Sequence, residues 1–183
     1  MKYLLAFLLA ACTATQTLKE SANNPPPAAT AEIGKAGFIC DADCTDNEKT
    51  KLASAEVLVN KVLHSECFAK FFLARQLEQK YLKGQSNAAI LKKLQSTVLA
   101  VPVHYYYSWK GVVGYRQPPK PDIFFNRKFH NNFDACNTAS NAAHEWSHSL
   151  GFEHDFKSTS TRPFSVPYRI NAGFDKCCRT ELK

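Results

Sequence analysis

The chain has 183 residues, 45% of them hydrophobic, and a formal net charge of +7. This is enough for one domain of ordinary size with a real core. The lysines, for example Lys61, Lys70 and Lys93, are spread over predicted helix faces and never form a run with interleaved aromatic residues. A solvated basic surface of this kind argues against nucleic acid as a partner.

Residues 1–11 have the pattern of an export signal. Met1 and Lys2 precede a short apolar stretch, which is too short to span a bilayer as a stable helix. The end of this stretch, Leu9-Ala10-Ala11-Cys12, resembles the bacterial lipobox, in which the cysteine is lipidated and becomes the new N-terminus. We therefore predict an exported protein, anchored by a lipid on Cys12 in the bacterial cell envelope, either in the periplasm or at the cell surface. The alternative is an ordinary signal peptide, cleaved nearby, and a secreted protein.

A proline-rich segment follows the signal. Residues 12–32 are polar and poor in large apolar groups, so they cannot bury a core. We interpret them as a flexible tether that holds the following domain away from a membrane. Residues 33–183 then form a single domain, for which we expect a monomer.

The cysteines indicate a disulfide framework. Cys12 would carry lipid, and the even remainder suggests three disulfides in an exported chain. Excluding a strained bond between neighbouring cysteines reduces the possible pairings from about 15 to about 12, and the sequence does not choose among them. The six candidates are Cys40, Cys44, Cys67, Cys136, Cys177 and Cys178.

Two amphipathic helices are predicted in the first half of the domain. Thr45-Asp46-Asn47-Glu48 matches a capping box, and apolar residues from Leu52 to Phe71 follow at intervals of three or four, with a break near Ser65. A shorter helix is expected to begin at Ser86, after a turn at Lys83-Gly84-Gln85.

The second half predicts strands and then a helix. Val101–Tyr107 and Val112–Tyr115 have the composition of a hairpin turning at Lys110-Gly111, and Asp122–Phe125 is a third strand that we place at the sheet edge. A helix should open at Asn137 or Thr138 and run to Leu150. The fold class is therefore α+β: a backing helix, a short mixed sheet, an active-site helix and a compact irregular C-terminal subdomain.

The segment His144–Asp155 reads HExxHxxGxxHD. His144 and His148 are four residues apart, so they project from one face of a helix and can bind one ion. Gly151 can adopt the positive φ that ends a helix and redirects the chain. His154 then becomes a third ligand, and the fourth position stays open for water, as in catalytic zinc sites.

This segment resembles the zinc signature of the metzincin metallopeptidases, and its final His-Asp pair is similar to that of adamalysins and snapalysin. The resemblance implies that Glu145 is the general base and that Asp155 anchors the structure below the site. The family also has a methionine in a turn beneath the metal, whereas Met1 is the only methionine here. The segment Ser165–Tyr168 resembles that turn with a proline in its place, and Tyr168 lies either near the reacting oxyanion or in the core.

The function predicted from these features is that of an exported or envelope-anchored zinc endopeptidase acting on polypeptide. Two alternatives remain open: a zinc hydrolase acting on peptidoglycan or another envelope polymer, and a non-catalytic lipoprotein stabilised by zinc. We expect structural roles for the remaining histidines and a disulfide at Cys40 rather than a role for the Phe38–Asp41 segment in blocking the metal. The remaining histidines are His64, His104 and His130.

Overall fold

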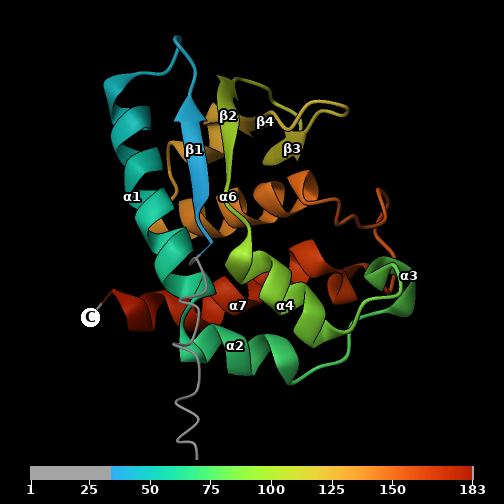
Figure 1. Cartoon of the computed structure of the whole chain (residues 1–183). Coiled ribbons are helices and arrows are strands. Elements are labelled where there is room, and N and C mark those ends of the chain that lie inside the picture. The colour runs from blue at the N-terminus through green and yellow to red at the C-terminus, as the bar shows by residue number, and fades with distance from the viewer. Residues whose placement is uncertain (1–33, 183) are drawn as a thin grey trace, which may run out of the picture. The chain divides into compact units, whose positions relative to one another are not determined.

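A four-stranded mixed sheet forms one layer of the fold, and helices cover it (Figure 1). The computed structural model describes residues 34–182. The predicted signal, the lipidation site at Cys12 and the tether up to residue 32 lie outside the described residues. The strands are β1 (Ala36–Cys40), β2 (Leu99–Tyr106), β3 (Gly114–Arg116) and β4 (Ile123–Asn126).

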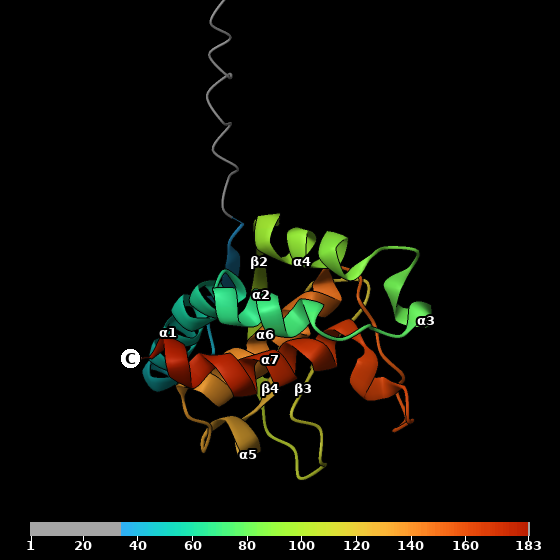
Figure 2. The same cartoon turned by 90° about the horizontal axis from the view of Figure 1, so that it is seen from below.

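The helices account for most of the described residues, so the α+β class is confirmed. They are α1 (Asp46–Leu63), α2 (Glu66–Leu73), α3 (Gln79–Leu82), α4 (Asn87–Ser96), α5 (Arg127–His130), α6 (Ala135–Ser149) and α7 (Val166–Glu181), with a 3-10 turn at Arg162–Phe164. In Figure 1, α6 runs behind the sheet and contacts α1, α7 and β3. Both views show α2 beside α7 (Figure 1 and Figure 2).

The strand order is β1-β2-β4-β3. Strand β2 pairs in parallel with both β1 and β4, and β3 pairs antiparallel with β4. The predicted hairpin is therefore wrong, because β4 lies between the two strands assigned to it. The side chain of Asn126 on β4 hydrogen-bonds to the backbone of Ser108, Lys110 and Val112, which holds the connection open instead of letting it turn back tightly.

The same order corrects a second prediction. The segment Asp122–Phe125 contributes to β4, an interior strand, and not to the sheet edge. Its side chains Ile123 and Phe125 are fully buried, as expected for a strand with neighbours on both sides. The edge beside α6 is formed by β3.

Three of the helices, α1, α2 and α4, begin where the sequence predicted. The Thr45 hydroxyl accepts from the amide of Glu48, and the Glu48 carboxylate accepts from the amide of Thr45, so the capping box is confirmed. The Ser65 hydroxyl caps α2 by accepting from the amide of Phe68, and the Ser86 hydroxyl caps α4 by accepting from the amide of Ala89. The break near Ser65 therefore separates α1 from α2, and each serine supplies an acceptor to an otherwise free amide.

Small and aromatic residues place α6 at the centre of the domain. Ala139, Ala142, Ala143 and Trp146 are fully buried, and the alanines let neighbouring backbones approach closely. The indole Nε1 of Trp146 donates to the carbonyl of Leu99, 3.0 Å away, which ties α6 to β2. The helix begins at Ala135, two or three residues earlier than predicted, since Asp134 caps it by accepting from the amide of Asn137.

The C-terminal region is a long helix, so the predicted irregular subdomain is wrong in this detail. Pro167 lies in the first turn of α7, where a proline costs no hydrogen bond. Position 173, inside the helix, requires a glycine, because a Cβ there would come within 2.7 Å of the Phe68 ring. Pro167 thus starts the helix, and Gly173 permits its contact with α2.

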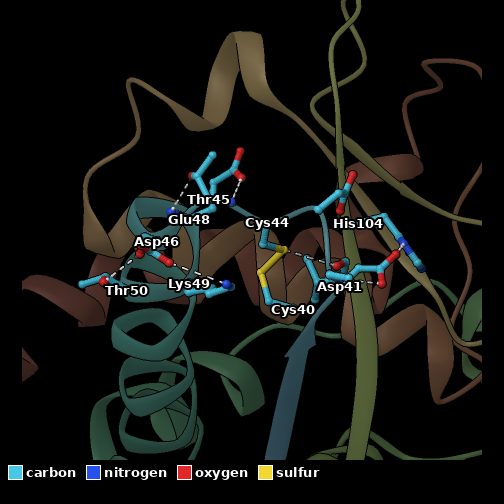
Figure 3. Close-up of a disulfide and its surroundings, with 12 residues drawn as sticks. Cys40, Asp41, Cys44, Thr45, Asp46, Glu48, Lys49, Thr50 and His104 are labelled. Carbon is cyan, nitrogen blue, oxygen red and sulfur yellow. Dashed lines mark hydrogen bonds and ion pairs between the residues drawn. A yellow bond between two sulfur atoms is a disulfide. The ribbon is translucent and has the colours of Figure 1, made fainter.

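Three disulfides join the six predicted cysteines, which is typical of an oxidising compartment. One closes the turn between β1 and α1 and lies beside His104 and Asp41 (Figure 3). The other two attach neighbouring cysteines of α7 to α2 and to α6. The pairs are Cys40–Cys44, Cys67–Cys177 and Cys136–Cys178. Among residues 34–182, no helix is long and apolar enough to span a bilayer.

Candidate metal centre

Two histidines of α6 form the base of the site. His144 and His148 are one turn apart on the same helix face, and both are buried. Their ring centroids are 5.2 Å apart. The rings therefore project side by side into a cavity of about 980 Å³, bounded by β3, α6, α7 and the segment after α6.

The chain reverses immediately after α6. Gly151 has a φ of +87°, which favours glycine. Its amide donates to the carbonyl of His148, and the amide of Phe152 donates to the carbonyl of Ser147. These two bonds form a Schellman motif, with Phe152 buried beneath the helix end. The reversal returns His154 toward the other two histidines.

The three histidines converge. Candidate ligand atoms of His144, His148 and His154 all lie within 4.8 Å of one another. The Nε2 atoms of His144 and His154 are 3.2 Å apart. In His148, Nδ1 lies 2.7 Å from the carbonyl oxygen of Phe152, and in His154, Nδ1 lies 3.0 Å from that of Asp155. A ring that donates through Nδ1 presents an unprotonated Nε2 to a metal ion.

The electrostatics also fit a cation. Burial, together with the neighbouring histidines, lowers the pKa of His144, and burial is likewise the main cause of the lowered pKa of His148 and His154. Neutral imidazoles are the form that binds metal ions. Three such donors with space beside them suit a divalent ion with an open coordination position.

Glu145 lies beside the histidines and lines the cavity. Burial, and then the charge of Glu153, raise the pKa of Glu145 to about 8. A divalent cation held by the histidines would oppose this shift, because an opposite charge nearby favours the ionised carboxylate. The edge strand comes close at this point, since a Cβ added to Gly114 would lie 3.3 Å from Glu145 Oε1.

Tyr168 lies against His144 and His154, at the start of α7. Its ring centroid is 5.1 Å from that of His144 and 4.9 Å from that of His154. It also lines the cavity, and the Arg162 guanidinium lies 4.8 Å from its ring centroid. Tyr168 is thus placed where the turn-like segment Ser165–Tyr168 meets the histidines.

Asp155 connects the end of the motif to the rest of the domain. Its carboxylate accepts from Lys80, 2.7 Å away, and from Thr159 and Thr161. The bond from Lys80, followed by that from Thr159, lowers the pKa of Asp155 well below its usual range. These bonds hold the segment after His154 against α3 and keep that histidine in place.

The other histidines lie outside the convergent group. His64 bonds to backbone carbonyls, His104 lies between the carboxylates of Asp41 and Asp122, and His130 bonds to Asn141. Figure 3 shows His104 directed toward Asp41 beside the disulfide of Cys40. That disulfide occupies the Cys40 thiol.

Several cavity residues were not predicted from the sequence, and four of them are the asparagines and the serine of the lining. Asn137, Ser140 and Asn141 extend the histidine face of α6 toward its N-terminus, and Asn171 approaches from α7. Asn137, Asn141, His144 and His148 follow one another at intervals of three or four, so the helical period already indicated a shared face. Asn171 has no such signal, because its position depends on how α7 contacts α6.

Comparison with known protein families found no match, and comparison with curated proteins found none either. The resemblance to the metzincins therefore depends on the His144–Asp155 segment alone.

Proposed function

We propose that this protein is a zinc-dependent endopeptidase that acts on polypeptide outside the cytoplasm. The observation that carries the proposal is the convergence of His144, His148 and His154 beside Glu145 in an open cavity. Three imidazoles with an open position are typical of catalytic zinc, whereas structural zinc has four protein ligands.

Zinc held by these histidines would polarise a peptide carbonyl and lower the pKa of a nearby water. The chain supplies the other parts of the reaction. The carboxylate of Glu145 accepts the proton of the attacking water and delivers it to the departing amine nitrogen. The Tyr168 ring lies against two of the ligands, where its hydroxyl can donate to the developing oxyanion.

An extended substrate fits along β3. This strand is the last in the sheet order, so its outer backbone groups have no partner strand among residues 34–182. Addition of a peptide to such an edge gives hydrogen bonds that do not depend on the peptide's sequence. Gly114 brings this edge next to Glu145, which places a peptide bond held there beside the proposed base.

The proposed location follows from the cysteines. The three disulfides agree with an oxidising compartment. We infer that Cys12 carries the lipid that anchors the domain in a bacterial envelope, and that the proline-rich segment up to residue 32 separates the domain from the membrane. Flexible polypeptide at that surface would be the substrate.

The test compares the zinc-loaded wild-type protein with Glu145→Ala. Substrates are a proteome-derived peptide pool, casein and purified cell wall, and zinc content is measured in parallel. We expect Glu145→Ala to retain zinc and to lose at least about a hundredfold in peptide cleavage, the lower end of what a general base contributes. Glu66→Ala, which removes an exposed carboxylate of α2, should leave cleavage unchanged. Unchanged cleavage in Glu145→Ala would disprove the mechanism.

A further inference from the structure

The cavity has two chemically different ends. Around the C-terminal end of α6, its lining includes Arg116, Glu153 and Arg162, and the Glu153 carboxylate lies 3.3 Å from His148 Nδ1 and 3.8 Å from Arg116. Toward the N-terminus of α6, the lining polar residues are uncharged. We call this uncharged end the amide subsite; it consists of Asn137, Ser140, Asn141 and Asn171.

The amide subsite lies close to the metal centre, separated from it by one or two side chains. Because a helix rises 1.5 Å per residue, Asn141 lies roughly 5 Å and Asn137 roughly 10 Å from His144 along the axis of α6. Gly114 lies close to this part of the helix, since a Cβ there would be 2.9 Å from Asn141 Nδ2. A peptide on β3 with its scissile bond at Glu145 would therefore direct a neighbouring side chain into the amide subsite.

Several amide groups in the subsite remain available to a ligand. The Ser140 hydroxyl donates to Asn171 Oδ1, 3.2 Å away, and this bond orients the Asn171 amide. The Asn141 amide nitrogen bonds to His130 Nε2 at 2.9 Å, which leaves Asn141 Oδ1 as an acceptor. Among the described residues, the Asn171 amide nitrogen and the Asn137 side chain have no hydrogen-bond partner.

We propose that the amide subsite selects an uncharged, hydrogen-bonding side chain, foremost the carboxamide of glutamine or asparagine, next to the peptide bond that is cut. The inference rests on the proposed peptidase function and specifies its substrate class. A carboxamide can donate and accept at once, which matches the free donors and acceptors of the subsite. An apolar side chain would remove these groups from water without replacing their hydrogen bonds.

Charged side chains are disfavoured for a different reason. The nearest lining carboxylate, Glu145, is committed to the proposed chemistry, and Arg116 and Arg162 lie at the other end of the cavity. At the N-terminus of α6, Asp134 is already paired with Arg179 at 3.0 Å. A lysine or glutamate entering the amide subsite would thus lose hydration without gaining an opposite charge.

The first test is a cleavage-site profile of the zinc-loaded wild-type protein on a peptide library. Glutamine or asparagine should exceed leucine at one position flanking the cut by about tenfold or more in kcat/KM. The same library is ranked by binding to Glu145→Ala. If no peptide is cut, the proposed function fails, yet the binding ranking still decides the subsite. Equal or tighter binding of leucine peptides, or no ranking at all, overturns the inference.

The second test changes the preference. Asn171→Asp keeps the oxygen that accepts from Ser140 but replaces the amide donor with a negative charge. We expect the preferred residue to shift from glutamine toward lysine or arginine, by about tenfold in the ratio of kcat/KM values. Asn47→Leu, an exposed change on α1, should leave the profile unaltered. An unchanged profile in Asn171→Asp, with its thermal unfolding unchanged, would refute the assignment.

Discussion

At the scale of single residues, His130 illustrates how a histidine near the site can be structural. Its ring is buried and stacks on Phe125 with centroids 4.2 Å apart. Its Nε2 accepts from Asn141, so the ring needs to be neutral at that atom. Burial, and then the charge of Lys51, lower the pKa of His130 to about 3, although Glu48 acts in the opposite direction.

This shift predicts a pH dependence of stability. In the unfolded chain His130 takes up a proton as pH falls below about 6.5, whereas in the folded protein it stays neutral down to about pH 3. Its contribution to stability is therefore complete above pH 6.5 and declines by about 1.4 kcal/mol per pH unit between these values. The side chain in His130→Gln can still accept from Asn141. Between pH 7 and pH 5, the free energy of unfolding of this variant should fall by about 2 kcal/mol less than that of the wild type.

The measurement is urea unfolding of both proteins at several pH values. The three histidines of the candidate metal centre are present in both proteins, so the difference between the two curves isolates His130. Parallel curves would show that His130 is not buried as a neutral ring.

At the scale of the elements, the end of α6 decides whether His154 reaches the other two histidines of the candidate metal centre. Gly151 combines a φ of +87° with open space, because a Cβ there would meet no atom within 4 Å. A substitution at this position thus tests backbone strain alone. The strain falls on the reversal that returns His154 to the histidine group.

We predict that Gly151→Ala lowers stability by about 1 to 2 kcal/mol and weakens zinc binding. Gly151→Asn should lose less stability than Gly151→Ala, since asparagine tolerates the left-handed region better than alanine does. The matched control is Gly111→Ala, where a Cβ also meets nothing within 4 Å and φ is not positive. Denaturant midpoints and zinc content check the prediction, and equal stability of the alanine and wild-type proteins would contradict it.

Elements could be predicted where their signals are local. The capping box at Thr45 and the serines before α2 and α4 define helix starts within a few residues, and the structure confirms them. The order of the strands could not be predicted, because alternation along a strand does not say which strand is its neighbour. The length of α7 was missed because proline and glycine usually interrupt a helix. Pro167 instead lies in the first turn, and Gly173 is explained only by its contact with the distant Phe68 of α2.

The same distinction applies to the metal centre. Its three histidines lie within the His144–Asp155 segment, and one helix turn plus one reversal brings them together, so spacing alone predicted the group. The amide subsite needs two helices. Asn171 joins it only because α7 is held against α6, and that contact has no counterpart in local sequence.

At the scale of the whole molecule, the disulfides fix α7. Neighbouring cysteines of this helix point to different partners, Cys67 on α2 and Cys136 on α6. Since α7 also carries Tyr168 and Asn171, the bond Cys136–Cys178 holds two walls of the cavity together, α6 and α7, whereas Cys67–Cys177 attaches α7 to α2, which does not line the cavity. The third bond, Cys40–Cys44, closes only a short turn.

Loop length then predicts an order of stabilities. The bonds enclose separations of 110, 42 and 4 residues for Cys67–Cys177, Cys136–Cys178 and Cys40–Cys44. Chain entropy assigns them roughly 5, 4 and 2 kcal/mol. Replacing each pair with alanines should therefore lower the free energy of unfolding in that order, measured in urea.

Removing Cys136–Cys178 should also weaken the glutamine preference, because it frees α7 from α6, whereas removing Cys40–Cys44 should leave that preference intact. If the glutamine preference survived removal of Cys136–Cys178 but was lost on removal of Cys40–Cys44, the residues that select glutamine would lie outside the α6–α7 contact.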